Sequence, residues 1–269
     1  MISPTDNFSV RPASHMAAYA KCIGILTATR WEVNAVRRAF SVEEERSIHG
    51  TRCVVGHRRD CRLFLFQTGI GVQSASNATH HALSALQLDL LISTGFACAL
   101  ADSAVGDLLI GTDVVPYGRG DVGFPEDRIF RCAPEVSALA MQVARSTGLP
   151  AHEGRLATVS RVLSRASEKR AVAERTAAIA ADMESIGICA AAESRHIPVL
   201  VARAASDLLN EDLPLDFNYF LGRAGWIRGT AHLLANPGSF RGLNRMRRQG
   251  KVGGERLTGF FVNFLDALH

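Results

Sequence analysis

The sequence predicts a single α/β domain in which helices flank a central, mainly parallel mixed β-sheet, followed by a helical C-terminal tail. Three observations predict this class. Short, continuous apolar runs recur along residues 22–206, as in strands buried on both faces. Segments with helical spacing separate them, as in strand–helix–strand units. Glycines or acidic residues stand where several runs end, which is where open α/β sheets bind ligands.

The elements follow in order from this pattern. Residues 22–28 form the first apolar run, and Thr29 is a suitable N-cap for a helix whose apolar residues begin at Trp31. Six further strands are expected at 62–67, 88–94, 105–115, 154–159, 177–183 and 197–206. Helices are expected at 74–86, which is rich in small residues, at 133–147, at the charged segment 167–176, and at 185–195. The strand at 88–94 is expected to stop at Gly95.

The C-terminal part is expected to be a loop and then helices. Residues 208–218 form the loop, and helices are expected at 219–235, 239–249 and 255–268. Asn-Pro-Gly at 236–238 and the glycines of 250–254 are expected to interrupt them. We divide the chain into a flexible lead-in at 1–20, a main domain at 21–235 and a helical, basic and apolar extension at 236–269.

Composition excludes several classes of protein. With 47% hydrophobic and 21% charged residues in 269, the chain can bury a core of ordinary size. A net charge of +4 is too small to predict nucleic-acid binding. No run approaches the roughly 18 to 20 apolar residues of a membrane-spanning helix, and the first twenty residues lack the apolar centre of a signal peptide. The cysteines form no CxxC pair, which favours reduced thiols in a cytosolic protein over disulfides or a metal site. They are Cys22, Cys53, Cys61, Cys98, Cys132 and Cys189.

Acidic side chains follow three of the predicted strands, at Glu32, Glu184 and Asp207, and the glycine-containing segment Thr68–Gly71 follows another. Parallel strands bring such ends to one edge, where the set suits cleavage of a glycosidic bond through a cationic, sugar-like transition state. One carboxylate would activate water, one hold sugar hydroxyls and one protonate the leaving base. Each acid also has an ordinary explanation, because acids favour first turns of helices and Ser-Asp pairs often form turns.

The order of these motifs resembles the nucleoside phosphorylase superfamily, and within it the 5'-methylthioadenosine/S-adenosylhomocysteine nucleosidases. The matching segments are Gly24–Val33, Thr68–Gly71, Ser93–Gly95, Gly106-Asp107, Asp182–Ser185 and Arg203–Asp207. The resemblance implies that Glu32 activates the attacking water and that Met183 and Glu184 contact the ribose. It further implies that Asp207, supported by Ser206, protonates N7 of the purine. No cofactor is expected.

The nucleophile stays open between water and inorganic phosphate as a co-substrate. Arg30 and Arg203 are the candidates for binding phosphate, and the resemblance places Arg203 near the site. A carboxylate at Glu32 favours water, because it accepts a proton and would repel a phosphate dianion.

Two departures from the nucleosidases concern the substrate contacts. Phe96–Ala99 stands where the nucleosidases have Ser-Ala-Gly-Gly, and the bulkier Phe96 bears on the ribose or anion contacts expected of Gly95, Phe96 and Ala97. Val162 and Leu163 stand where an aromatic side chain stacks on the base. The segments Ser160–Ser164, Ser167–Arg170 and 236–247 resemble the hopanoid-associated phosphorylases. That resemblance implies adenosylhopane as the substrate and release of adenine in hopanoid biosynthesis.

The tail allows two interpretations. Phe240, Leu243 and Met246 alternate with arginines, a pattern that suits a helix lying on an anionic membrane. The apolar stripe within Leu257–Leu268 is expected instead to pack on the body of the protein or on a second subunit. The expected partners are a small-molecule or lipid-linked nucleoside and, by the resemblance, further copies in a homo-oligomer, but no nucleic acid. The alternatives are an ordinary methylthioadenosine/adenosylhomocysteine nucleosidase, a futalosine hydrolase and a non-catalytic nucleoside-binding protein.

Overall fold

The computed structural model describes residues 20–118, 122–214, 218 and 239–268, with side chains of the last segment from residue 244. The predicted lead-in, apart from Ala20, and the predicted helix at 219–235 lie outside these residues.

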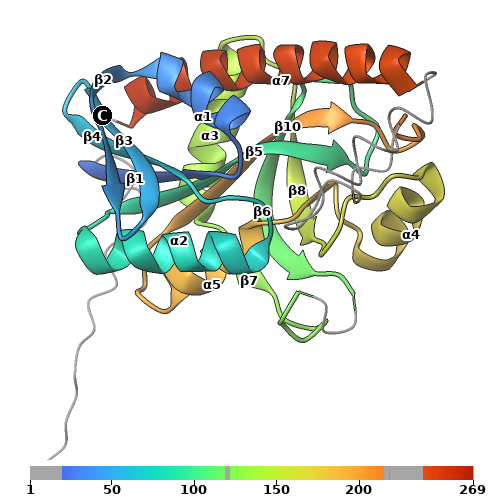
Figure 1. The fold of residues 1–269 in the computed structure, drawn as a ribbon, viewed down its shortest axis with the longest axis horizontal. Coiled ribbons are helices and arrows are strands. Elements are labelled where there is room, and N and C mark those ends of the chain that lie inside the picture. Colours follow the sequence, from blue (N-terminus) through green and yellow to red (C-terminus); the bar gives the residue numbers. More distant parts are fainter. Residues whose placement is uncertain (1–19, 119–121, 215–217, 219–238, 269) are drawn as a thin grey trace, which may run out of the picture.

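A mixed, ten-stranded sheet forms the centre of the molecule (Figure 1). Its strands are β1 (Cys22–Thr27), β2 (Ser41–Ile48), β3 (Thr51–Arg58), β4 (Cys61–Gln67), β5 (Leu90–Ala99), β6 (Leu108–Pro116), β7 (Phe130–Arg131), β8 (Ala151–Thr158), β9 (Ala180–Asp182) and β10 (Val199–Asp207). The order is β2-β3-β4-β1-β5-β10-β6-β8-β9, with β7 on β6. Because β5 pairs with β1, β10 and β9, the strands β5, β10, β6, β8 and β9 close into a ring.

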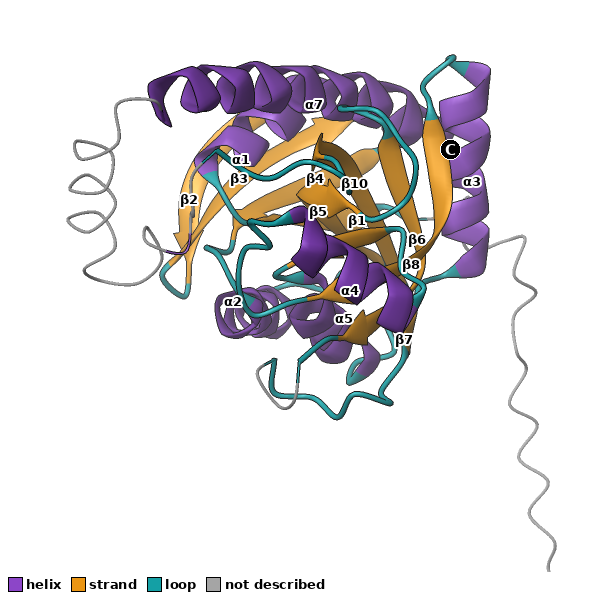
Figure 2. Cartoon of the chain, turned by 90° about the vertical axis from the view of Figure 1, so that its right-hand side faces the viewer, coloured by secondary structure: helices purple, strands orange, loops and turns teal. Residues whose placement is uncertain are grey.

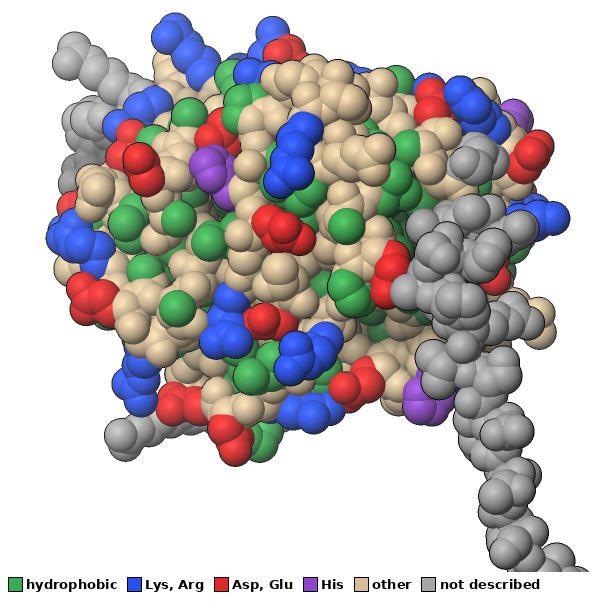
Figure 3. Space-filling view, turned by 180° about the vertical axis from the view of Figure 1, so that it is seen from behind, with side chains coloured by type: hydrophobic (Ala, Val, Ile, Leu, Met, Phe, Trp, Pro, Cys, Tyr) green, Lys and Arg blue, Asp and Glu red, His purple; other side chains and the backbone are tan. Residues whose placement is uncertain are grey.

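Helices cover both faces of the sheet, which confirms the predicted α/β class (Figure 2). They are α1 (Arg30–Val36), the 3-10 turn η3 (Arg37–Ala39), α2 (Val72–Ala85), α3 (Pro134–Ser146), α4 (Ala166–Thr176), α5 (Ser185–Glu193) and α7 (Ser239–Ala267). One apolar core lies between the sheet and α1, α3 and α7, and a second lies between the sheet and α2 and α5. On the face seen in Figure 3, acidic and basic side chains are interspersed.

The predicted interruption of the tail at 250–254 is wrong, because α7 runs unbroken from Ser239 to Ala267. Gly250 faces Trp31, and a Cβ on Gly253 would lie 2.9 Å from Cε1 of Phe96. These glycines let α7 approach the domain closely, so tertiary packing outweighs their low helix propensity. None of the described helices is long and apolar enough to cross a membrane.

The apolar stripe within Leu257–Leu268, at the end of α7, packs on the body of the protein, as one of the two interpretations predicts. Its members are at most 1% exposed: Leu257, Phe260, Phe261, Phe264, Leu265 and Leu268. They contribute to the same core as α1 and α3. The last helix is therefore part of the folded domain.

Two strand predictions also need correction. The strand expected to stop at Gly95 continues through it to Ala99, with Gly95 at φ +146°. The segment expected as a strand from Ala177 has Ala177 in the left-handed region, where it ends α4, and β9 begins only at Ala180. The hairpin of β2 and β3 was not expected from the sequence.

Candidate active site

Glu32 is held between the start of α1 and strand β5. Its Oε2 accepts hydrogen bonds from the N–H and the hydroxyl of Thr29, at 2.7 and 2.9 Å, which completes a capping box at the helix start. Its Oε1 accepts the backbone N–H of Phe96 at 2.8 Å. The side chain is therefore both a helix cap and a buried carboxylate fixed at the end of β1, with 4% of the residue exposed.

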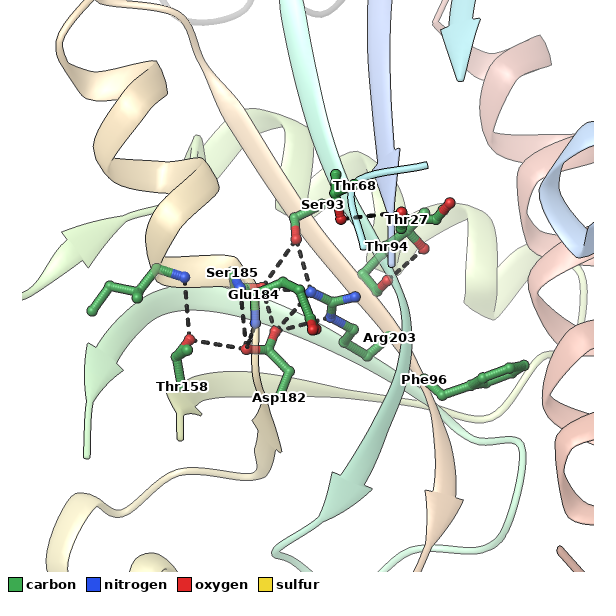
Figure 4. Close-up of polar contacts among 12 residues, drawn as sticks. Thr27, Thr68, Ser93, Thr94, Phe96, Thr158, Asp182, Glu184, Ser185 and Arg203 are labelled. Carbon is green, nitrogen blue, oxygen red and sulfur yellow. Dashed lines mark hydrogen bonds and ion pairs between the residues drawn. The ribbon is translucent and has the colours of Figure 1, made fainter. Parts of the chain in front are cut away.

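Gly95 lies close to the side chains of both Glu32 and Arg203. A Cβ at this position would lie 2.2 Å from Oε1 of Glu32 and 2.9 Å from Nη1 of Arg203. The next residue, Phe96, turns its ring toward α7 and away from Arg203 (Figure 4). The predicted site residues Gly95 and Phe96 thus contribute backbone to the site, and the Phe96 ring packs on Gly253 of α7.

Arg203 is the centre of a buried polar network (Figure 4). Its Nε and Nη2 both bind Oδ2 of Asp182, at 3.0 and 2.8 Å. Nη2 also donates to the hydroxyls of Ser93 and Ser185, at 2.8 and 2.9 Å, and Oδ1 of Asp182 accepts the hydroxyl of Thr158 at 2.9 Å. Only 1% of Arg203 is exposed, and Nη1 is the part of its guanidinium that faces Gly95. The other candidate phosphate ligand, Arg30, is an exposed residue outside this network.

Glu184 stands at the N-terminus of α5, beside the glycine-containing loop. Its Oε1 accepts the backbone N–H of Gly71 at 2.8 Å, so the Thr68–Gly71 segment and Glu184 share one edge, as predicted. Burial raises the pKa of Glu184 to about 7, although the Arg203 guanidinium nearby favours the charged form. The carboxylate of Asp182 adds to the increase. Met183 next to it is half-buried.

Asp207, at the end of β10, is bound on both oxygens. Oδ1 accepts the hydroxyl of Ser206 at 2.7 Å, and Oδ2 accepts Nζ of Lys169 at 2.5 Å. The Ser206 hydroxyl also donates to the carbonyl of Ala97 at 3.1 Å, which ties the acid to β5. The strand that carries Gly95 thus reaches both Glu32 and Asp207.

Val162 and Leu163 lie in the loop before α4. Leu163 is buried, and Val162 is half-buried. The side-chain amide of Asn218 accepts the N–H of Val162 and donates to its carbonyl, each at 2.9 Å.

Sequence reasoning missed two functional candidates. Lys169 stands in a predicted charged helix and was not named as a site residue, but it is fully buried against Asp207. Asp182 was noted only as part of a motif, although it neutralises Arg203. Its position at the end of an apolar strand was the available signal. Within the described ranges, no group of three or more His, Cys, Asp or Glu residues is arranged to hold a metal ion.

A groove of about 650 Å³ opens between α1 and α7, next to the Glu32 segment. Trp31, which is 60% exposed, Ala35 and Phe96 give it apolar walls. Its basic lining residues are Arg38, Arg247, Arg248 and Lys251.

Comparisons with known proteins agree with this architecture. A family model described as "Phosphorylase superfamily" matches residues 22–231. The chain is 26% identical over 212 residues to a 5'-methylthioadenosine/S-adenosylhomocysteine nucleosidase of Staphylococcus aureus, covering 75% of this chain and 93% of the relative.

Solved structures show the same fold. The nucleosidase of Neisseria meningitidis in complex with methylthio-immucillin-A has a TM-score of 0.68 at 18% identity, covering 90% of this chain and 99% of that one. Futalosine hydrolase of Helicobacter pylori has a TM-score of 0.65 at 21% identity, covering 85% and 98%.

Proposed function

Because the chain belongs to the phosphorylase superfamily, we propose that it is an enzyme that cleaves the N-glycosidic bond of an adenine nucleoside. The observation that carries this proposal is the fixed arrangement of three buried acids, Glu32, Glu184 and Asp207, around strand β5. Cleavage of this bond builds positive charge on the sugar and negative charge on the base. Carboxylate groups can stabilise the first charge, and a protonated carboxyl group can neutralise the second.

Each acid has a role that its contacts support. Glu184, fixed by Gly71, would accept hydrogen bonds from the ribose hydroxyls, with Met183 packing beside the sugar. Asp207, with Ser206, would protonate N7 of the purine, and Val162 and Leu163 lie in the loop proposed to border the base. Glu32 would take a proton from the attacking water.

Water is the proposed nucleophile. Arg203 is committed through Nε and Nη2 to Asp182, which leaves Nη1 to polarise a small neutral nucleophile beside Glu32. A phosphate dianion at this place would be repelled by the Glu32 carboxylate. If adenine release requires phosphate, Glu32 does not act as the base for water.

We further propose that the 5' substituent is bulky and apolar, as in adenosylhopane. The groove between α1 and α7 supports this, because the Trp31 and Phe96 walls adjoin the segment that holds Glu32. Its basic rim at Arg247 and Arg248 would also favour a peripheral contact of α7 with an anionic membrane. We propose a homo-oligomer as well, which light scattering would test.

The deciding experiment measures adenine release from adenosylhopane, methylthioadenosine and adenosylhomocysteine, each with and without phosphate. Selective release from the hopanoid supports the lipid-linked substrate. Release from the two small thio-nucleosides alone would make the protein an ordinary nucleosidase, the alternative that the Staphylococcus aureus relative favours.

Glu32→Gln and Asp207→Asn separate an enzyme from a nucleoside-binding protein. An enzyme loses turnover while it keeps affinity for the nucleoside. A wild-type protein that binds the nucleosides but releases adenine from none of them would overturn the proposed activity.

A further inference from the structure

Lys169 is a fully buried lysine whose hydrogen-bonding capacity is used completely by the segment around Asp207. An ammonium group has three donors. Nζ donates to Oδ2 of Asp207 at 2.5 Å and to the carbonyls of Leu208 and Glu211, each at 2.9 Å. No part of the residue is exposed to solvent. A buried charge is costly unless it is paired, and here the partner is the proposed general acid.

The pairing leaves Asp207 with a chemical problem. Both carboxyl oxygens of Asp207 accept hydrogen bonds, one from the ammonium of Lys169 and the other from the hydroxyl of Ser206. A general acid must instead carry a proton when the base departs. Asp207 is only 8% exposed, so a proton source inside the site is needed.

Other titratable groups near the pair do not supply this proton. Burial, and next the Asp207 carboxylate, raise the pKa of the Cys98 thiol well above its usual value, which keeps it protonated. On α4, Arg170 binds the side chain of Asn210. In the loop after β10, Asp212 accepts the N–H of Ala166. The guanidinium of Arg170 and the carboxylate of Asp212 therefore bind partners other than Asp207.

The neighbouring acid Glu211 is likewise directed elsewhere. Its carboxylate accepts the side-chain amide of Gln249 at 3.5 Å, while only its backbone carbonyl meets Lys169. Besides the Cys98 thiol and the Ser206 hydroxyl, the ammonium of Lys169 is thus the proton-bearing side chain that contacts Asp207 among the described residues.

We propose that Lys169 is the positioning residue that sets the proton on Asp207: it passes a proton from Nζ to Oδ2 as the carboxyl group protonates the leaving purine. This inference rests on the proposed function. The bond from C1' to N9 breaks, its electron pair goes to the purine, and the new N7–H takes the proton supplied through Asp207. The oxygen of the attacking water forms the new bond to C1', and Glu32 takes the proton that this water loses. After product release, Glu32 returns a proton to solvent and the Lys169 amine regains one.

The test uses two substrates and two variants in the full-length protein. One substrate is an adenine nucleoside that the wild type cleaves. The other is the 4-nitrophenyl glycoside of the same sugar, whose leaving group departs without protonation. Lys169→Met removes the proton and the charge. Lys169→Arg keeps a charge and donors, but its guanidinium does not release a proton.

We expect Lys169→Met to lower kcat for adenine release at least about 100-fold, the usual scale of general acid catalysis. The loss of activity at high pH should move to lower pH, because Asp207 would then depend on solvent for its proton. Release of 4-nitrophenol should change far less. Lys169→Arg should not restore adenine release. Arg170→Met, one residue along α4 and exposed, is the matched control and should retain activity on both substrates.

If Lys169→Met impairs adenine release, two further results still overturn the proton role. One is restoration of wild-type adenine release and pH profile by Lys169→Arg, which would leave charge alone as the requirement. The other is an equal loss on both substrates at every pH by a Lys169→Met protein that melts like the wild type. A wild type that releases no adenine would instead overturn the proposed function. Adenine release that Lys169→Met leaves unchanged overturns only this inference.

Discussion

The carboxylate of Glu32 and the backbone N–H of Phe96, 64 residues apart, share a hydrogen bond of 2.8 Å. Strands β1 and β5 are neighbours in the sheet. This hydrogen bond joins helix α1, which follows β1, to the backbone of β5. The carboxylate is therefore fixed before any substrate arrives, which suits the role of proton acceptor proposed for it.

Gly95→Ala should abolish most activity and lower stability. The new methyl group would lie 2.2 Å from Oε1 of Glu32, at a backbone φ of +146° that side chains rarely adopt. We expect a loss of about 1 to 3 kcal/mol in the free energy of unfolding, measured by urea denaturation. Gly123→Ala, at a φ of +78° with nothing within 4 Å, is the control for backbone strain alone. Equal activity in the two variants would contradict this interpretation.

The pKa of Glu184 predicts a pH-dependent stability. Its folded value of about 7 lies above the ordinary value of 4.5, so between these pH values the folded protein binds more protons than the unfolded chain. The free energy of unfolding should therefore fall as pH rises through this window, by up to about 1.4 kcal/mol per unit of pKa difference. Glu184→Gln should remove this part of the slope. Denaturation of the wild type and of Glu184→Gln at pH 5 and pH 8 measures this change in the free energy of unfolding. An equal change in the two proteins would refute the prediction.

The same ionisation should appear in catalysis. Ionised Glu184 accepts hydrogen bonds from sugar hydroxyls with both oxygens, whereas the protonated group has one donor. We expect kcat/KM to fall as pH drops below about 7. The measurement is a pH profile of adenine release, with Glu184→Gln expected to be slow throughout and to lack this limb.

Asp182→Asn should be strongly destabilising. The substitution keeps the shape of the side chain but leaves the charge of Arg203 buried without its partner. Removing one member of a buried ion pair costs about 3 to 5 kcal/mol. Lys251→Met breaks the exposed pair with Glu255 and should cost less than about 1 kcal/mol. Thermal unfolding compares the two variants. Similar melting temperatures would show that Asp182 does not stabilise the buried charge of Arg203.

Phe264→Ala tests whether α7 belongs to the folded domain. The ring is fully buried and stacks on Phe260 at a centroid distance of 5.2 Å. Truncating a buried phenylalanine costs about 3 to 5 kcal/mol, so the melting temperature should fall by several degrees. Asn263→Ala, on the exposed side of the same helix, should change it little. If α7 bound a membrane through this apolar stripe, the Phe264 ring would have to be exposed in the wild type, and the substitution would then cost little stability.

The sequence predicted β1, β4, β5 and β10 well because each contains a short apolar run, such as Cys22–Thr27 in β1. It did not predict the β2–β3 hairpin, whose edge strand β2 is exposed and carries charges at Glu43–Arg46. The signal that remained was the turn at His49-Gly50, where both residues have positive φ, as two-residue hairpins prefer.

The acidic residues of the site could be predicted from the sequence. The residues that contact them were harder to predict. Glu32, Glu184 and Asp207 follow strands, and the topology of a parallel sheet brings such positions to one edge. Lys169 was not predictable as a site residue, because nothing in a charged helix distinguishes the one lysine that faces inward. The direction of the Phe96 ring likewise depends on a glycine of α7 that lies far along the chain.

The position of β5 between β1 and β10 has a consequence for synthesis of the protein. The ribosome synthesises β5 early, but its neighbour β10 is the last strand of the sheet along the chain. The apolar core between the sheet and α1, α3 and α7 is complete only when α7 has been added. A growing chain on the ribosome can therefore pair β1, β4 and β5 long before Asp207 and the phenylalanines of α7 have left the exit tunnel. Catalytic competence should arrive in a single late step, so the return of activity during refolding would time the closing of the sheet.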